Sequence, residues 1–238
     1  MSELKEVYDE RRLEVSSYLE ILQVIDGAAK NGRVAISGTK FVLENKQIKM
    51  MYSTLFLHLY GLIECILSSF LREIEKFLRS GKATPSNLPP ELFKLWVSNA
   101  FRGDKDLTLE KKIDIASQIF WSGYKKEPIT KDFKFYSSLF KKNVDLNEIK
   151  TFLGKFDISL NLSRECNSAI NRRVLNDENV LTSIKSLRNK LAHGEQSFFE
   201  ASSGFDFATL SAWSATTLKF TDELVDLLDN YLDKNTLS

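Results

Sequence analysis

The chain has 238 residues, enough for one large domain or two small ones with a hydrophobic core that needs no disulfide or metal ion. Its 33 Lys and Arg residues nearly balance 32 Asp and Glu residues, and a formal net charge of +1 excludes a global basic field for nucleic acid. The 43% hydrophobic and 27% charged fractions are those of a soluble globular protein.

The cysteines and the first residues bear on the compartment. Cys65 and Cys166 match no zinc or redox spacing, and MSELKEVYDERR lacks the apolar region of a secretory signal, so we expect a cytoplasmic protein. Residues 51–71 have the length of a membrane span. His58 and Glu64 lie away from the ends of that stretch, which favours a buried core helix over a membrane partner.

The first third of the chain predicts two long helices. Glycine and proline are scarce (10 and 4), and apolar residues recur at helical spacing, so the fold class is expected to be all-α. A helix from about Glu3 to Ala29 is followed by Arg33 to Leu43, which alternates about a Ser-Gly turn and predicts a short hairpin. The most apolar helix, about Asn45 to Arg79, should be the centre of the fold. The apolar positions of the first helix include Val7, Leu13, Tyr18, Leu22 and Ile25.

The middle third predicts shorter helices after a run of turn residues from Ser80 to Pro90. They are expected at 91–101, 109–124, 145–156 and 161–174. No single piece has enough apolar face to stand alone, so 85–175 is interpreted as a helical insertion. Trp96 and Trp121 are interpreted as core anchors.

Two late helices complete a predicted helical bundle. The first spans residues 176–194 and ends at Gly194, and the second runs from about Asp206 to Leu232. Acidic residues recur along the last helix and are interpreted as a solvated face, not a metal site: Asp222, Asp226, Asp229 and Asp233. We therefore expect one domain over 1–238, with a bundle core of about 1–80 and 176–236.

The stretch SIKSLRNKLAHGEQSF gathers an arginine, an asparagine and one of the two histidines at a predicted helix end. The core stripe of this helix is predicted to be Val180, Ile184, Leu187 and Leu191. Arg188 lies on the flank of that stripe. Asn189 and His193 lie four residues apart on roughly the opposite side, so His193 is predicted to face solvent or another surface such as a second subunit.

These residue types suit phosphodiester transfer without a metal. An imidazole can exchange protons with a ribose 2′-hydroxyl or a leaving 5′-oxygen, and a guanidinium can hold the phosphate. One copy has one such histidine, so acid and base together would need two copies across a dimer interface. The alternative is a well-capped helix end, with Lys, Arg and His near the negative end of the helix dipole and Gly194 at the left-handed position.

Other polar residues carry weaker signals. His58, beside Leu57 and Leu59, is interpreted as a packing histidine. Glu64 lies in an apolar segment and is expected to be paired, either structurally or in a site. Arg172 and Arg173 form a basic pair that suits an RNA backbone or an exposed helix end equally well.

LRNKLAHG, ahead of a long amphipathic final helix, resembles the R-x(4–6)-H signature of the HEPN superfamily (higher eukaryotes and prokaryotes nucleotide-binding domains). LFLHLYGLIECILSSFLREI, with Tyr60, Gly61 and Glu64, resembles the second helix of the MAE-like HEPN endoribonucleases, and YDERRLEVSSYLEIL resembles their first helix. Gly61 stands where those relatives more often have Asn. The middle third carries no resemblance that we identify.

The resemblance implies a HEPN-like bundle that pairs as a homodimer and cleaves RNA without cofactors, as a toxin or anti-phage defence effector with an antitoxin or regulatory partner. It implies catalytic roles for Arg188 and His193 and supporting roles for Asn189 and Glu64. Lys185 and Lys190 are then the expected RNA contacts. The alternative is a non-catalytic HEPN-like module that binds nucleotide, RNA or a partner protein.

Overall fold

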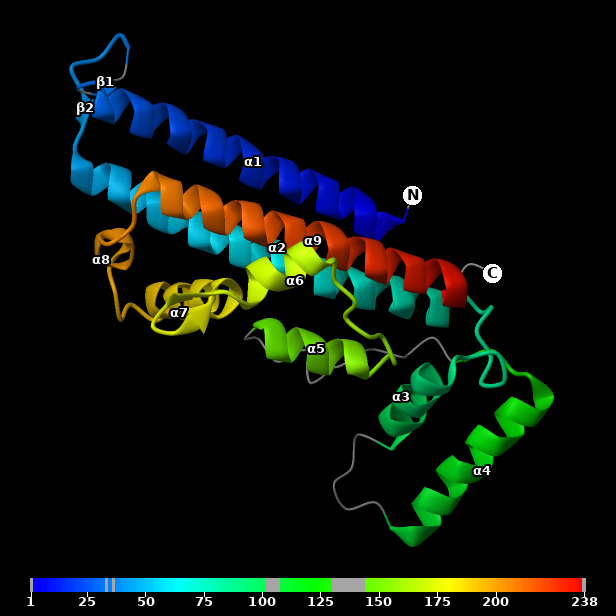
Figure 1. The fold of residues 1–238 in the computed structure, drawn as a ribbon. Coiled ribbons are helices and arrows are strands. Elements are labelled where there is room, and N and C mark those ends of the chain that lie inside the picture. The colour runs from blue at the N-terminus through cyan, green and yellow to red at the C-terminus, as the bar shows by residue number, and fades with distance from the viewer. Residues whose placement is uncertain (1, 33, 36, 102–107, 130–143, 237–238) are drawn as a thin grey trace. The chain divides into compact units, whose positions relative to one another are not determined.

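The computed structural model describes residues 2–32, 34–35, 37–101, 108–129 and 144–236. Nine helices and two short hairpins occur within these ranges, which confirms the predicted all-α fold class (Figure 1). The helices are α1 (Glu3–Lys30), α2 (Asn45–Arg79), α3 (Pro90–Ala100), α4 (Leu109–Lys125), α5 (Leu146–Gly154), α6 (Arg164–Asn171), α7 (Val180–Ala192), α8 (Phe198–Ser202) and α9 (Phe207–Thr236). The strands are β1 (Val34–Ala35), β2 (Val42–Leu43), β3 (Arg173–Leu175) and β4 (Glu178–Asn179).

The first two helices confirm their predicted ranges, and the hairpin between them is present. β1 pairs antiparallel with β2, with Val34 opposite Leu43. The Ser2 side chain accepts a hydrogen bond from the Lys5 N–H and so caps the start of α1. Leu13, one of the apolar positions of this helix, is 67% exposed. The residues of α1 that are buried are Leu4, Tyr8, Val15 and Leu22.

Helix α2 is apolar enough to cross a membrane by length and composition alone, with a mean hydropathy of 1.6 over its most apolar window. In the structure 56% of that window is buried by the protein's own residues. The core helix of a soluble protein passes the same test, so this property is weak support for a membrane span.

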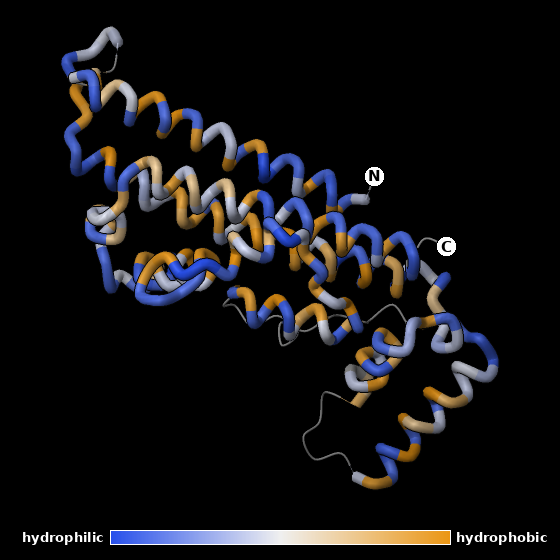
Figure 2. The backbone as a smooth tube through the Cα atoms, in the orientation of Figure 1, coloured by the Kyte–Doolittle hydropathy of each residue, from blue (hydrophilic) through white to orange (hydrophobic). Residues whose placement is uncertain are grey.

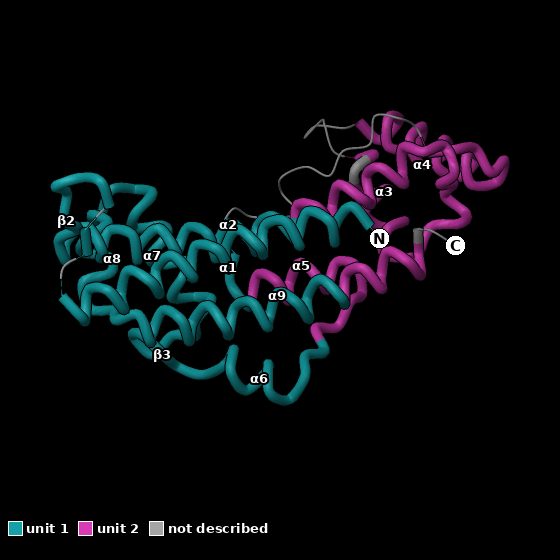
Figure 3. The backbone as a smooth tube through the Cα atoms, turned by 90° about the horizontal axis from the view of Figure 1, so that it is seen from above, with its two compact units in different colours: residues 1–67, 143–146, 161–226 teal, residues 68–142, 147–160, 227–238 magenta. Residues whose placement is uncertain are grey.

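The chain divides into two compact units, coloured separately in Figure 3, and both α2 and α9 are divided between them. Unit 1 comprises residues 1–67, 143–146 and 161–226. Its core is formed by buried side chains of α2, α7 and α9, including Phe56, Leu59, Ile184, Phe220 and Leu224. Phe56, Phe205 and Trp213 pack their rings against one another there. The organisation as one domain with an insertion at 85–175 stays a prediction.

Unit 2 comprises residues 68–142, 147–160 and 227–238. Phe70, Phe152, Phe156 and Tyr231 form an aromatic cluster from α2, α5, the segment after α5, and α9. The interpretation of Trp121 as a core anchor was wrong, because 52% of its side chain is exposed. Helix α4 buries none of its residues, although hydrophobic and hydrophilic residues alternate along it in Figure 2.

The segment before α7 differs from the prediction. The helix expected over 161–174 ends at Asn171, and β3 and β4 follow as an antiparallel hairpin. Asn176 and Asp177 both have positive φ, 48° and 59°, as the tight turn between these strands requires. Asn and Asp tolerate this conformation better than other non-glycine residues, which explains the turn here. The short helix α8 was not expected.

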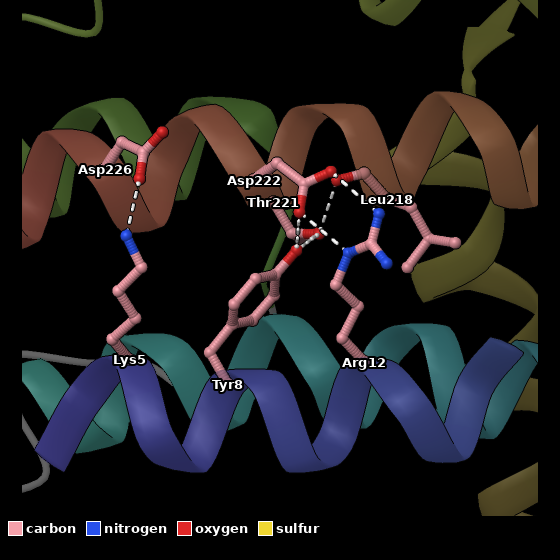
Figure 4. A network of polar contacts seen from close by, with 7 residues as sticks. All are labelled: Lys5, Tyr8, Arg12, Leu218, Thr221, Asp222 and Asp226. Carbon is pink, nitrogen blue, oxygen red and sulfur yellow. Dashed lines mark hydrogen bonds and ion pairs between the residues drawn. The ribbon is translucent and has the colours of Figure 1, made fainter. Parts of the chain in front are cut away.

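Helices α1 and α9 are joined by polar contacts that correct the interpretation of the acidic face (Figure 4). Asp222 accepts hydrogen bonds from the Tyr8 hydroxyl at 2.6 Å and from Arg12 Nε at 2.8 Å. Asp226 pairs with Lys5 at 3.5 Å. Two of the four acidic residues therefore hold α1 against α9 instead of only facing solvent. Among the described residues, no group of three or more His, Cys, Asp and Glu could hold a metal ion.

Candidate active site at the end of helix α7

Helix α7 has clear start and stop signals. The Asn179 side chain accepts a hydrogen bond from the Thr182 N–H at 3.0 Å, which caps the first turn. The helix ends at Ala192, His193 is its C-cap residue, and Gly194 follows with a φ of 69°. The buried residues of α7 are Val180, Leu181, Ser183, Ile184 and Leu187, whereas Leu191, predicted to be in the core, is half-buried.

Arg188 lies half-buried between α7 and α2. Its guanidinium carbon is 4.3 Å from the centre of the Tyr60 ring, a cation–π contact. Its Nη2 is 3.9 Å from Glu64 Oε1, and its Nη1 donates a hydrogen bond to Asn189 Oδ1 at 3.1 Å. The guanidinium is thus oriented from three sides by side chains of its own chain.

Tyr60 is the platform for this arginine. It is 2% exposed, and its hydroxyl accepts a hydrogen bond from the Val144 N–H at 3.2 Å. Burial raises the pKa of Tyr60, the hydrogen bond from Val144 lowers it, and the Glu64 carboxylate raises it, so that the pKa lies above its usual value and the phenol stays neutral. Tyr60 and Glu64 are four residues apart on α2 and share one face of that helix.

The two lysines predicted to contact RNA have different surroundings. Lys185 Nζ is 2.5 Å from Asp145 Oδ2, and the two side chains are only 23% and 15% exposed. Lys185 therefore holds Asp145, the residue before α5. Lys190 lies half-buried on α7, and its carbonyl accepts hydrogen bonds from the Glu195 and Gln196 N–H groups beyond the helix end.

His193 is exposed, unlike Arg188. Its backbone N–H donates to the Asn189 carbonyl at 2.9 Å, which continues the helical pattern to the cap. His193 lies five positions after Arg188, and at 100° per residue their side chains leave α7 in directions about 140° apart. The Asn189 side chain leaves α7 about 40° from that of His193 and is hydrogen-bonded to Arg188. Asn189 therefore lies between the side of α7 that carries Arg188 and the side that carries His193.

A comparison with protein-family models matches residues 1–237 to the family described as HEPN_MAE_28990-like HEPN. The chain belongs to this HEPN family. The match also takes in the middle third, for which the sequence alone suggested no relative. No curated protein and no solved structure matched the chain.

The structure of this HEPN protein brings together part of the predicted site. Arg188, Asn189 and Glu64 are in contact, and His193 projects elsewhere from the same helix end. Our choice of site residues omitted Tyr60 and Asp145. The spacing of Tyr60 and Glu64 was a usable signal for the first, because residues four apart on a helix share a face. Asp145 lies in an irregular segment and gave no periodic signal.

Proposed function

We propose that this HEPN protein is a metal-independent endoribonuclease whose site combines the α7 ends of two protomers. The observation that carries the proposal is the oriented guanidinium of Arg188 on the same helix end as the exposed His193. HEPN proteins as a family are associated with ribonuclease activity, which supports this assignment. The cleavage chemistry, the dimer and the role of each residue are parts of the proposal.

Arg188 would hold the scissile phosphate and stabilise the charge of the pentacoordinate transition state. Its ion pair with Glu64 is long, 3.9 Å, and the two side chains are 28% and 31% exposed. Such a pair contributes no more than about 1 kcal/mol, so a phosphate oxygen can replace the carboxylate. The Tyr60 ring would keep the guanidinium in place during this exchange, because it contacts the cation face and not its N–H donors.

His193 would transfer the protons. One imidazole accepts the proton of the 2′-hydroxyl while the 2′-oxygen attacks phosphorus, and another donates a proton to the departing 5′-oxygen. The products are a 2′,3′-cyclic phosphate and a 5′-hydroxyl. His193 and Arg188 leave α7 about 140° apart, so a second copy of α7 would have to complete the site.

The biological setting follows from the same proposal. We propose a cytoplasmic toxin or anti-phage defence effector that acts as a homodimer, without cofactors and away from membranes. With a net charge of +1, tight nonspecific RNA binding is not expected of this chain alone. An antitoxin or regulatory partner would therefore control access of RNA to the site.

The test is cleavage of a mixed RNA pool in EDTA by the wild type, Arg188→Ala and His193→Ala. Each variant should cleave at least about a hundredfold more slowly than the wild type, as removal of an acid–base or charge-stabilising group usually does. The matched controls are Arg164→Ala, an exposed arginine of α6, and His58→Gln, the second histidine. Unchanged cleavage by the two α7 variants, with dimerisation and folding intact, would show that the end of α7 takes no part in catalysis.

A second candidate function is a non-catalytic module that binds RNA, nucleotide or a partner protein. The contacts of Arg188 favour this function. Arg188 contacts Tyr60, Glu64 and Asn189 of its own chain, as a residue with a structural role would. In that case Arg188→Ala would lower thermal stability, and the wild type would bind RNA without cutting it.

A further inference from the structure

Unit 1 contains a pocket that shares no lining residue with the contacts of Arg188. It is a cavity of about 380 Å³ formed by α6, β3, the first residue of α7 and the first half of α9. Six of its lining residues carry the argument: Arg172, Arg173, Val174, Ala212, Trp213 and Thr216. The volume falls in the range of small-molecule sites, about 300 to 1,000 Å³.

The charge of this pocket has one sign. Arg172 and Arg173 supply two exposed guanidinium groups, and none of the lining residues in the described part of the chain is acidic. Arg173 Nη1 donates to the Asp177 carbonyl at 2.5 Å, which fixes the side chain and leaves its other donors available. The carboxylate that α6 presents, Glu165, is paired with Lys219 of α9. The pocket therefore favours an anion with several acceptor oxygens.

One wall of the pocket is apolar. Val174 and Trp213 both line it, and Trp213, which is 5% exposed, packs its ring against Phe56 and Phe205. Thr216 already donates its hydroxyl hydrogen to the Ala212 carbonyl at 3.0 Å, so its oxygen remains an acceptor. A simple oxyanion would use the arginines and leave this wall empty. A ligand with both a phosphate and a flat ring would use the whole pocket.

We propose that this pocket binds a nucleoside phosphate, with the phosphate on Arg172 and Arg173 and the base against Val174 and Trp213. The ligand is either a free mononucleotide or one nucleotide of a single-stranded RNA, which present the same chemistry. The inference concerns binding and does not require that the α7 site cleaves RNA.

Isothermal titration calorimetry tests the proposal on the whole chain carrying His193→Ala, so that binding is measured without cleavage. The probes are AMP, UMP, inorganic phosphate and a 2′-O-methyl RNA tetranucleotide. We expect AMP or UMP to bind and the double variant Arg172→Ala/Arg173→Ala to weaken that binding at least about tenfold, since two charge-assisted contacts are lost. Arg164→Ala, which changes an arginine of α6 outside the pocket, should leave the affinity within about twofold.

A filled pocket gives a second, independent readout. Ala212 is exposed and lines the cavity, so Ala212→Phe keeps the charges and occupies the space for the base. It should abolish AMP and UMP binding while the protein still unfolds cooperatively. If the tetranucleotide binds more tightly than AMP and UMP, the ligand is an RNA strand, and the reverse order identifies a free nucleotide.

Three results would overturn the inference. They are no binding of nucleotides at millimolar concentration, equal affinity in all variants, and phosphate binding as tight as that of AMP and UMP. A protein that binds nucleotides here and never cleaves RNA would contradict only the proposed endoribonuclease.

Discussion

At the scale of single residues, the position of Arg188 depends on neighbours from α2. The Tyr60 ring lies under its guanidinium, and Glu64 contacts its edge. Sequence spacing placed Arg188 on the flank of the core stripe of α7 and Asn189 with His193 on the other side. In the structure His193 is exposed, as this placement predicted. The partners of Arg188 were not predictable, because they depend on how α7 packs along α2 and not on the period of either helix.

Replacing Tyr60 separates the role of its ring from that of its hydroxyl. Tyr60→Leu should lower the rate constant of RNA cleavage about fivefold, because a cation–π contact of about 1 kcal/mol no longer orients Arg188. Tyr60→Phe keeps the ring and loses the hydrogen bonds to Val144 and Glu64, so it should retain cleavage within about threefold. Single-turnover kinetics with saturating RNA would measure both. Equal losses in the two variants would show that the ring contact does not position Arg188.

At the scale of elements, the end of α7 sets where His193 lies. Gly194 has a φ of 69°, and open space surrounds the position of an added Cβ, so backbone strain alone opposes a side chain. The helix range and this glycine were predictable from cap residues. Helix α8 was not, since five residues are too short for a helical hydrophobic period. The β3–β4 hairpin was not either, because most of its residues were assigned to the two predicted helices on each side of it.

Gly194→Ala should lower the free energy of unfolding by about 1 kcal/mol, because alanine is strained in the left-handed region. Gly204→Ala is the matched control, since that glycine also has open space and no positive φ. It should be neutral or slightly stabilising. Urea denaturation of the three proteins measures the difference, and equal stabilities would contradict the cap assignment.

A second element-scale prediction concerns pH and the contact between α1 and α2. Asp26 is 2.7 Å from Lys30 and accepts a hydrogen bond from Tyr52 at 2.8 Å. Burial raises the pKa of Asp26, but the hydrogen bonds from Lys30 and Tyr52 together outweigh it and hold the pKa below its usual value. Because the folded-state pKa is depressed, the stabilisation is present above the unfolded-state pKa and is lost as pH falls through the folded-state pKa.

Asp26→Asn should therefore destabilise the protein at neutral pH and have a smaller effect in acid. Urea midpoints measured from pH 7 down to pH 3 for the wild type, Asp26→Asn and the exposed control Glu20→Gln would show this. A difference between wild type and Asp26→Asn that stays constant over this range would rule out the ionised carboxylate as its source.

At the scale of the whole molecule, the proposed site needs two copies of α7. The all-α class and the order of the long helices were predictable, because a long amphipathic pattern indicates a helix whatever that helix packs against. The two compact units were not anticipated, since α2 and α9 run through both of them and the boundaries inside these helices leave no linker composition to detect. The residues of a dimer interface have no sequence pattern that distinguishes them from other surface residues.

Dilution tests this pairing. If two protomers form the active site, cleavage per protomer should fall as the protein is diluted below the dimer dissociation constant. Sedimentation velocity over the same concentrations should show monomers appearing in parallel. Cleavage per protomer that stays constant while the dimer dissociates would mean that each chain cleaves alone.

The central claim, attack by a 2′-hydroxyl with proton transfer by His193, is tested most directly by the chemistry of the cut ends. A short RNA incubated with the protein in EDTA is predicted to yield 2′,3′-cyclic phosphate and 5′-hydroxyl ends. The same strand with a 2′-deoxyribose at the cleavage position is predicted to stay intact. Cleavage at the deoxy position, or ends carrying a 3′-hydroxyl and a 5′-phosphate, would contradict the account.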